Sequence, residues 1–123
     1  MVEKTVQVRG HVRKTKWKND IDLFIKGAKE KLKKYERTKN ELYLMQAGEK
    51  TWRAFVSLIK LKSKKDSASS RGRRYLAKKL GLEQLYRDAM LLHSYFYGGE
   101  ADDLGLIKET IDATLQKIKK QVK

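Results

Sequence analysis

Three residues of the segment 86–97 have the side-chain types that RNA cleavage by internal transesterification requires. That reaction needs a base for the 2′-hydroxyl, an acid for the leaving oxygen and a cation for the phosphorane. His93 can act as base or acid near neutral pH, and Arg87 can hold a phosphate in a bidentate fork. Asp88, next to Arg87, can orient one of them. We therefore treat Arg87, Asp88 and His93 as candidate catalytic residues.

The spacing of Arg87 and His93 restricts how they can meet. Six positions along a helix place two side chains about 120° apart. A shared site would need a bend in the helix, or a second subunit that brings its own pair across a two-fold axis. The alternative is a core or interface histidine bonded to a neighbour. The apolar ridge that His93 shares with Met90 and Tyr97 favours that alternative.

Two further residues are expected to be polar neighbours of His93. Glu49 interrupts the apolar stripe of a helix over residues 40–61 and falls on the same side as Trp52. Its carboxylate should be partly buried and paired, with Arg87 or His93 as the natural partner. Tyr97, four positions after His93, is the second neighbour.

The net charge of +15 is unevenly distributed along the chain. Residues 1–80 hold 24 Lys and Arg against 8 Asp and Glu, whereas residues 81–123 hold 6 against 7. This asymmetry favours an RNA or other polyanionic partner over a uniformly solvated surface. Contacts to phosphate would not read sequence. The candidate nucleic-acid-binding residues are Arg9, Arg13, Lys14, Lys16, Lys62, Lys64, Lys65, Arg71, Arg73 and Arg74.

Apolar residues that recur every three or four positions predict the elements that position these side chains. We expect residues 1–18 to form a flexible basic arm and residues 19–123 a single helical domain. The first helix should start near Asn19 or Asp20, and Asn40 should cap the second. A basic linker is expected over 62–74. The later helices are expected near 72–80, ended by Gly81, then near 83–97 and from about 102 onward. Four long helices and one short one predict an all-α antiparallel bundle.

The composition excludes several classes of site. The chain has no cysteine, so it has neither disulfides nor thiolate zinc sites. His11 and His93 lie in unrelated segments without metal-ligand spacing, and no Gly-rich phosphate loop is present, so no metal or cofactor is expected. No apolar run approaches the roughly 20 residues of a membrane span, and no signal peptide is evident. We expect a cytoplasmic location.

The segments 47–55 and 92–99 resemble an archaeal helical family known as PaREP, part of the HEPN-like group. In that pattern a Glu-Lys-x-Trp stretch precedes a Leu-His-x-x-Phe-Tyr stretch, as it does here. The resemblance implies a HEPN-like antiparallel bundle, commonly a homodimer. Active members of the group are metal-independent ribonucleases with an Arg, an adjacent polar residue and a His, which Arg87, Asp88 and His93 match. Other members are inactive, or accompany nucleotidyltransferases in toxin–antitoxin pairs.

These observations give three expectations. The leading one is RNA or polyanion binding through a basic surface. The second is a metal-independent endoribonuclease with a dimeric Arg/His site. The third is a protein-interaction partner of a nucleotidyltransferase.

Overall fold

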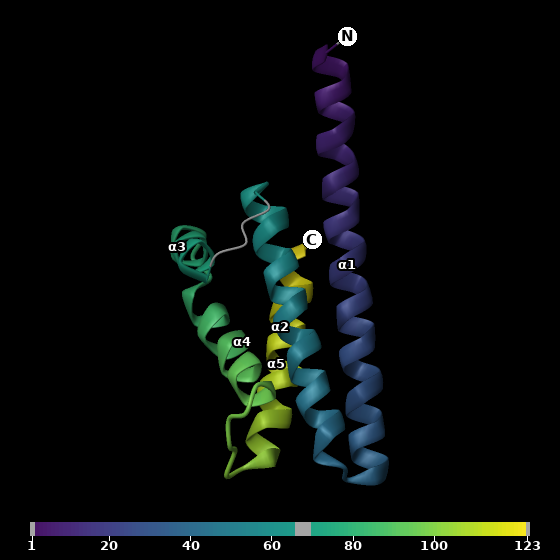
Figure 1. Cartoon of the computed structure of the whole chain (residues 1–123), viewed down its shortest axis with the longest axis vertical. Helices are drawn as coiled ribbons and strands as arrows, with labels where there is room; N and C mark the ends of the chain where they lie inside the picture. The colour runs from purple at the N-terminus through teal and green to yellow at the C-terminus, as the bar shows by residue number, and fades with distance from the viewer. Residues whose placement is uncertain (1, 66–69, 123) are drawn as a thin grey trace.

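The computed structural model describes the backbone of residues 2–65 and 70–122, and the side chains of residues 13–65 and 71–122. The described part is all-helical and contains no strand (Figure 1). Four longer helices and one shorter helix form it, as predicted. They are α1 (Val2–Thr38), α2 (Glu41–Ser63), the shorter α3 (Ser70–Lys79), α4 (Glu83–Phe96) and α5 (Leu104–Val122).

The expected start of the first helix near Asn19 or Asp20 is wrong, because α1 begins at Val2 and covers most of the predicted arm. No proline or turn separates the predicted arm from the first predicted helix, so the backbone stays helical through Asn19 and Asp20, the two residues expected to cap it. Trp17, which lies within the predicted arm, is buried, with 7% of its surface exposed. The side chain of Arg9 lies outside the described residues.

A tight turn joins α1 to α2 and folds them into an antiparallel pair (Figure 1). Lys39 has a left-handed φ of 57°. Asn40 then caps α2 as predicted, since its side-chain oxygen accepts a hydrogen bond from the Leu42 amide at 3.0 Å. The turn fixes which faces of the two helices meet.

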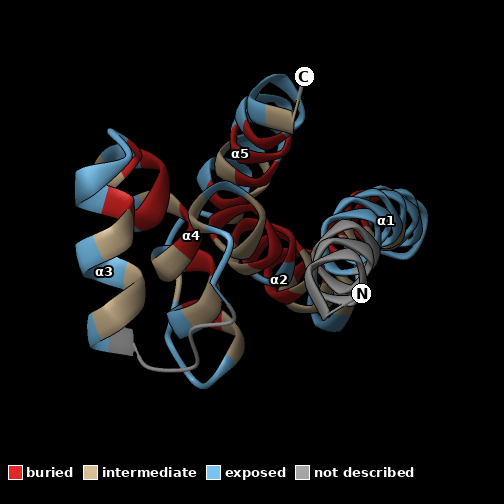
Figure 2. Ribbon diagram, turned by 90° about the horizontal axis from the view of Figure 1, so that it is seen from above, coloured by how far each residue is buried: buried red, intermediate tan, exposed pale blue. Residues whose placement is uncertain are grey.

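The α2 helix is the centre of the fold, with α1, α4 and α5 packed around it (Figure 2). Phe55 and Leu58 of α2 and Leu92 of α4 are fully buried in the core of the fold. Each contributes about 1.5–3 kcal/mol relative to an exposed position. Gly48 faces Leu92 of α4, and a β-carbon on that glycine would lie 3.4 Å from the leucine β-carbon. The two helices therefore pack close together at Gly48.

The linker expected over 62–74 is shorter in the structure, because α2 extends to Ser63 and α3 begins at Ser70. Arg71, Arg73 and Arg74 therefore lie on a helix. Gly81, with a φ of 73°, ends α3 as predicted. Its amide and the next one donate to the carbonyls of Lys78 and Ala77, which is a Schellman motif.

The last helix packs mainly on α2, with fewer contacts to α4 and fewest to α1. Its start is marked by Asp103, whose carboxylate accepts a hydrogen bond from the Leu106 amide at 3.0 Å. Ile111 and Ile118 are fully buried on its inner face. Among the described residues, no helix has the length and apolarity needed to span a membrane.

Candidate functional site

Glu49 of α2 and His93 of α4 form a polar contact at the close approach of the two helices. The His93 Nδ1 lies 2.9 Å from the Glu49 Oε2. The Glu49 side chain is 8% exposed and the His93 side chain 31%. A nitrogen at this distance from a carboxylate oxygen must carry the proton, so Nδ1 donates and Nε2 remains for other partners. Glu49 is buried and paired with His93, as expected.

The second carboxylate oxygen of Glu49 is directed at an arginine that follows one turn later on α2. The Arg53 Nε lies 3.6 Å from the Glu49 Oε1. Glu49 therefore orients His93 on one side and Arg53 on the other. Our sequence reasoning missed Arg53, although its four-residue spacing from a buried glutamate indicates such a pair.

Aromatic rings surround the imidazole. Trp52 stacks on His93 with ring centroids 4.8 Å apart, and Tyr97 packs edge-on to it, also at 4.8 Å. The Arg73 guanidinium of α3 lies over the Trp52 ring, 5.5 Å from its centroid. We call Glu49, Trp52, Arg53, His93 and Tyr97 the Glu49–His93 cluster.

The structure does not bring Arg87 and Asp88 to His93 within one subunit. Arg87 is exposed and pairs with Glu83 at 3.0 Å, one turn earlier on α4. Asp88 accepts a hydrogen bond from Gln84 and lies 3.9 Å from Lys117 of α5. The angular separation along α4 directs the three candidate side chains to different neighbours, which is the geometry that the six-residue spacing predicts for a straight helix.

A pocket of about 230 Å³ opens beside the cluster, where α1, α2 and the end of α4 meet. Three of its lining residues are basic, one is the cluster carboxylate, one is an amide and one is aromatic. They are Lys31, Gln46, Glu49, Lys50, Arg53 and Phe96, and we call this space the Glu49 pocket.

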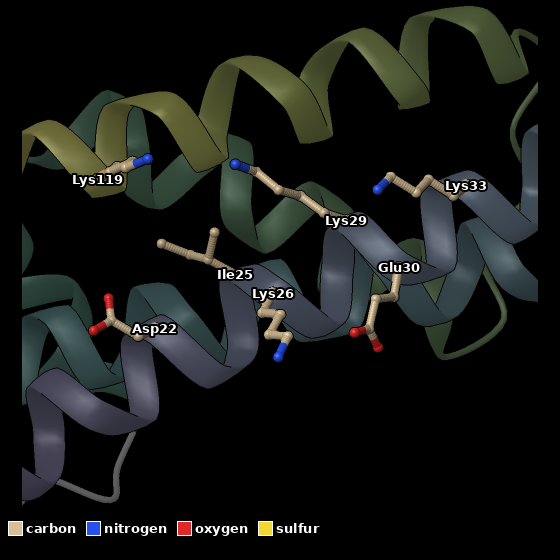
Figure 3. Close-up of a pocket in the computed structure, with 7 residues that line it drawn as sticks. All are labelled: Asp22, Ile25, Lys26, Lys29, Glu30, Lys33 and Lys119. Carbon is tan, nitrogen blue, oxygen red and sulfur yellow. The ribbon is translucent and has the colours of Figure 1, made fainter.

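A larger hollow lies between α1 and α5 (Figure 3). Its volume is about 400 Å³, and an adjoining pocket of about 300 Å³ shares Ile25, Lys29 and Lys119 with it. Because α1 and α5 both pack on α2 but touch each other little, the space between them remains open. We call the two pockets together the lysine groove. The first is lined by Asp22, Ile25, Lys26, Lys29, Glu30, Lys33 and Lys119, and the second adds Asp112, Leu115 and Gln116.

The ammonium groups of the groove gather from both helices. In Figure 3 Lys29 of α1 and Lys119 of α5 extend toward one another, and Lys33 points into the same space. None of these three lysines forms an ion pair with any residue that the structure describes. Ile25 and Leu115 are buried beneath them. The groove thus combines converging positive charge with an apolar floor.

The other predicted contacts are spread over the surface rather than gathered at one site. Those with described side chains are exposed, except Arg73, which is partly buried against Trp52. They lie on α1 and α3 and at or just after the end of α2, and none of them lines the lysine groove. The exposed residues are Arg13, Lys14, Lys16, Lys62, Lys64, Lys65, Arg71 and Arg74.

In the described ranges no group of His, Asp and Glu has an arrangement that could hold a metal ion. Comparisons of this chain with protein-family models, with curated proteins and with solved structures gave no match. The resemblance to the PaREP family and the HEPN-like group therefore stays a prediction.

Proposed function

We propose that this protein binds RNA through its basic surface, with the lysine groove as the most concentrated contact. The observation that carries the proposal is that Lys29 and Lys119 extend toward one another across the groove (Figure 3), and that neither forms an ion pair among the described residues. Like charges that face one another repel, and an anion between them adds two attractions that outweigh this repulsion. The phosphodiester backbone supplies such anions at regular intervals along a strand.

The apolar floor makes the groove more than a charged patch. Ile25 and Leu115 give the methylene stems of the lysines a surface to lie on, so that the ammonium groups extend beyond it. Asp22 and Asp112 line the same pockets but form no ion pair with these lysines. These carboxylates therefore do not neutralise the lysines through direct ion pairs.

The test is the salt dependence of binding to a single-stranded RNA, measured by fluorescence anisotropy. The double variant Lys29→Gln/Lys119→Gln removes two phosphate contacts, so the slope of log K against log salt should flatten by about 1.4. The matched control is Lys34→Gln/Lys120→Gln, which removes the same charge from the same two helices. Both control lysines are exposed and neither lines the groove.

We expect the control to keep most of the wild-type slope. Equal slopes for the two double variants would show that the groove has no special role. Affinity that does not change with salt would contradict RNA binding by this basic surface altogether.

A second candidate function is metal-independent RNA cleavage by His93. The favouring observation is that a buried carboxylate holds Nδ1 and leaves Nε2 for proton transfer, with Arg53 directed at the same carboxylate. Cleavage in EDTA should then be lost in His93→Ala and reduced in Arg53→Gln, while Arg87→Gln keeps activity. Loss of activity in Arg87→Gln would instead favour the dimeric Arg/His site, and unchanged cleavage by His93→Ala would end the hypothesis.

A further inference from the structure

The Glu49 pocket differs from the lysine groove because it offers polar and aromatic groups as well as cations. We infer that it binds a single nucleotide unit, with the phosphate on Lys31, Lys50 and Arg53 and the base against Phe96. This inference rests on the proposed function, since it places one unit of the bound RNA. The pocket volume of about 230 Å³ lies below the roughly 300 Å³ at which pockets for drug-sized ligands begin. A single unit, partly exposed, is what such a space accepts.

The charges of the pocket favour a phosphate. Three basic side chains line it against one carboxylate, and that carboxylate already holds His93 and Arg53. Only the Arg53 Nε is directed at Glu49, at an ion-pair distance of 3.6 Å, and no hydrogen bond of this guanidinium occurs among the described residues. Its remaining N–H groups can form the fork that phosphate oxygens accept.

Lys50 lines the pocket and packs across Gly27 of α1. A β-carbon at Gly27 would lie 2.9 Å from the Lys50 Cδ, closer than such atoms approach. The lysine stem therefore lies across the α1 backbone at a place where a side chain would displace it. The Lys31 Nζ approaches from α1 itself and lies 5.5 Å from the Tyr43 ring centroid.

Two groups of the pocket suit a base rather than a phosphate. Phe96 is partly buried at the pocket wall and presents a ring on which any base can stack. The Gln46 Oε1 is buried and has no hydrogen-bond partner among the described residues. A rotation of the Gln46 side chain toward the pocket would let this oxygen accept a hydrogen bond from the N–H edge of an incoming base. Inorganic phosphate would use neither group.

Titration of nucleotides followed by tryptophan fluorescence tests the inference. The chain has two tryptophans, so Trp17→Phe leaves Trp52, which stacks on His93 beside the pocket, as the only tryptophan. In this background we expect saturable quenching by adenosine, cytidine, guanosine and uridine 5′-monophosphates. Binding should be at least tenfold tighter than that of ribose 5-phosphate or inorganic phosphate.

Substitutions separate the base from the phosphate. Phe96→Leu should weaken the nucleoside monophosphates at least fivefold and leave ribose 5-phosphate unchanged, whereas Arg53→Gln should weaken every phosphate. Lys34→Gln is the control for loss of a positive charge, and circular dichroism confirms that each variant is folded. Equal affinity for all phosphates would overturn the inference. The absence of quenching by any of them at about 10 mM ligand, a concentration well above a millimolar dissociation constant, would overturn it as well.

The groove variant Lys29→Gln/Lys119→Gln distinguishes this inference from the proposed function. If the groove variant loses RNA affinity but the wild type binds no mononucleotide, the pocket inference alone is wrong. If mononucleotides bind and respond to Phe96→Leu while the groove variant binds RNA normally, the groove proposal alone is wrong. We expect the groove variant to bind mononucleotides with wild-type affinity.

Discussion

The Glu49–His93 cluster and the lysine groove lie on different sides of α2, and they differ in whether their charged groups are paired. In the cluster the buried carboxylate has two basic partners, and two aromatic rings pack against the imidazole. In the groove, three ammonium groups gather without an ion pair among the described residues. The difference shows which charges the fold pairs internally and which it leaves without an ion pair among the described residues.

Burial is the physical reason for the difference. A carboxylate that leaves water without a partner costs several kcal/mol, so Glu49 can occupy its position only with partners in place. The groove lysines are exposed, and water and salt screen them. They can therefore remain together at small cost. Substitutions in the cluster should consequently change mainly the free energy of unfolding, whereas substitutions in the groove should change mainly ligand binding.

The largest expected effect is on stability, from truncating the ring at the centre of the cluster. Trp52 is 4% exposed and contacts Phe55, Tyr86 and His93. We expect Trp52→Ala to lower the free energy of unfolding by about 3–5 kcal/mol, measured by urea denaturation. Leu42→Ala, at an exposed position of the same helix, should change it by less than about 0.5 kcal/mol. Similar values for both would mean that the cluster is not packed as described.

The next effect tests the buried Glu49–His93 contact against an exposed ion pair. Glu49→Ala should cost about 1–3 kcal/mol, because it leaves partly buried donors without an acceptor. A double-mutant cycle of Glu49 with His93 should give a coupling energy of about 1 kcal/mol. The same cycle on the exposed pair Glu83 and Arg87 should give at most about 0.5 kcal/mol. Equal coupling in the two cycles would contradict the difference in burial.

A second polar contact between α2 and α4 should give a pH effect of about 1 kcal/mol. Burial of Tyr95 and its hydrogen bond to Glu41, at 2.7 Å, raise the pKa of Tyr95 above its ordinary value. A folded-state pKa that exceeds the unfolded value of about 10 means that the contribution is complete below pH 10 and is lost above it. Tyr95→Phe should cost about 1 kcal/mol at pH 7.

The measurement for this contact is chemical denaturation from pH 8 to 11. Because many lysines titrate in the same range, the informative quantity is the difference between wild type and Tyr95→Phe. That difference should shrink as the pH rises above about 10. A difference that stays constant across the range would contradict the contribution of the tyrosine proton.

The smallest expected effect is a gain in stability from the groove. Lys29→Met/Lys119→Met removes two converging charges and should raise the free energy of unfolding by about 0.3 kcal/mol at low salt. The gain should disappear near 0.5 M salt, where the screening length falls to roughly 4 Å. A loss of stability in this variant would show that the two lysines serve the fold instead.

Local features were readable from the amino-acid order because helix periodicity and capping depend on neighbours in the chain. The spacing of apolar residues predicted the helical class and the burial of Glu49, and the Asn40 and Gly81 caps were confirmed at their positions. The predicted start of the first helix was wrong for a related reason. A residue such as Asn19 is able to cap a helix but does not force the chain to leave it.

Two features depended on how separate helices meet, and no local pattern contained them. Both Arg87 and His93 were plausible partners for Glu49, and only the approach of α2 to α4 at Gly48 selected the histidine. Likewise, Lys29 and Lys119 are 90 positions apart, and their meeting depends on how α1 and α5 diverge over α2. Amino-acid order specifies the faces of single helices, whereas side-chain volumes at the contacts between helices decide which of those faces form a site.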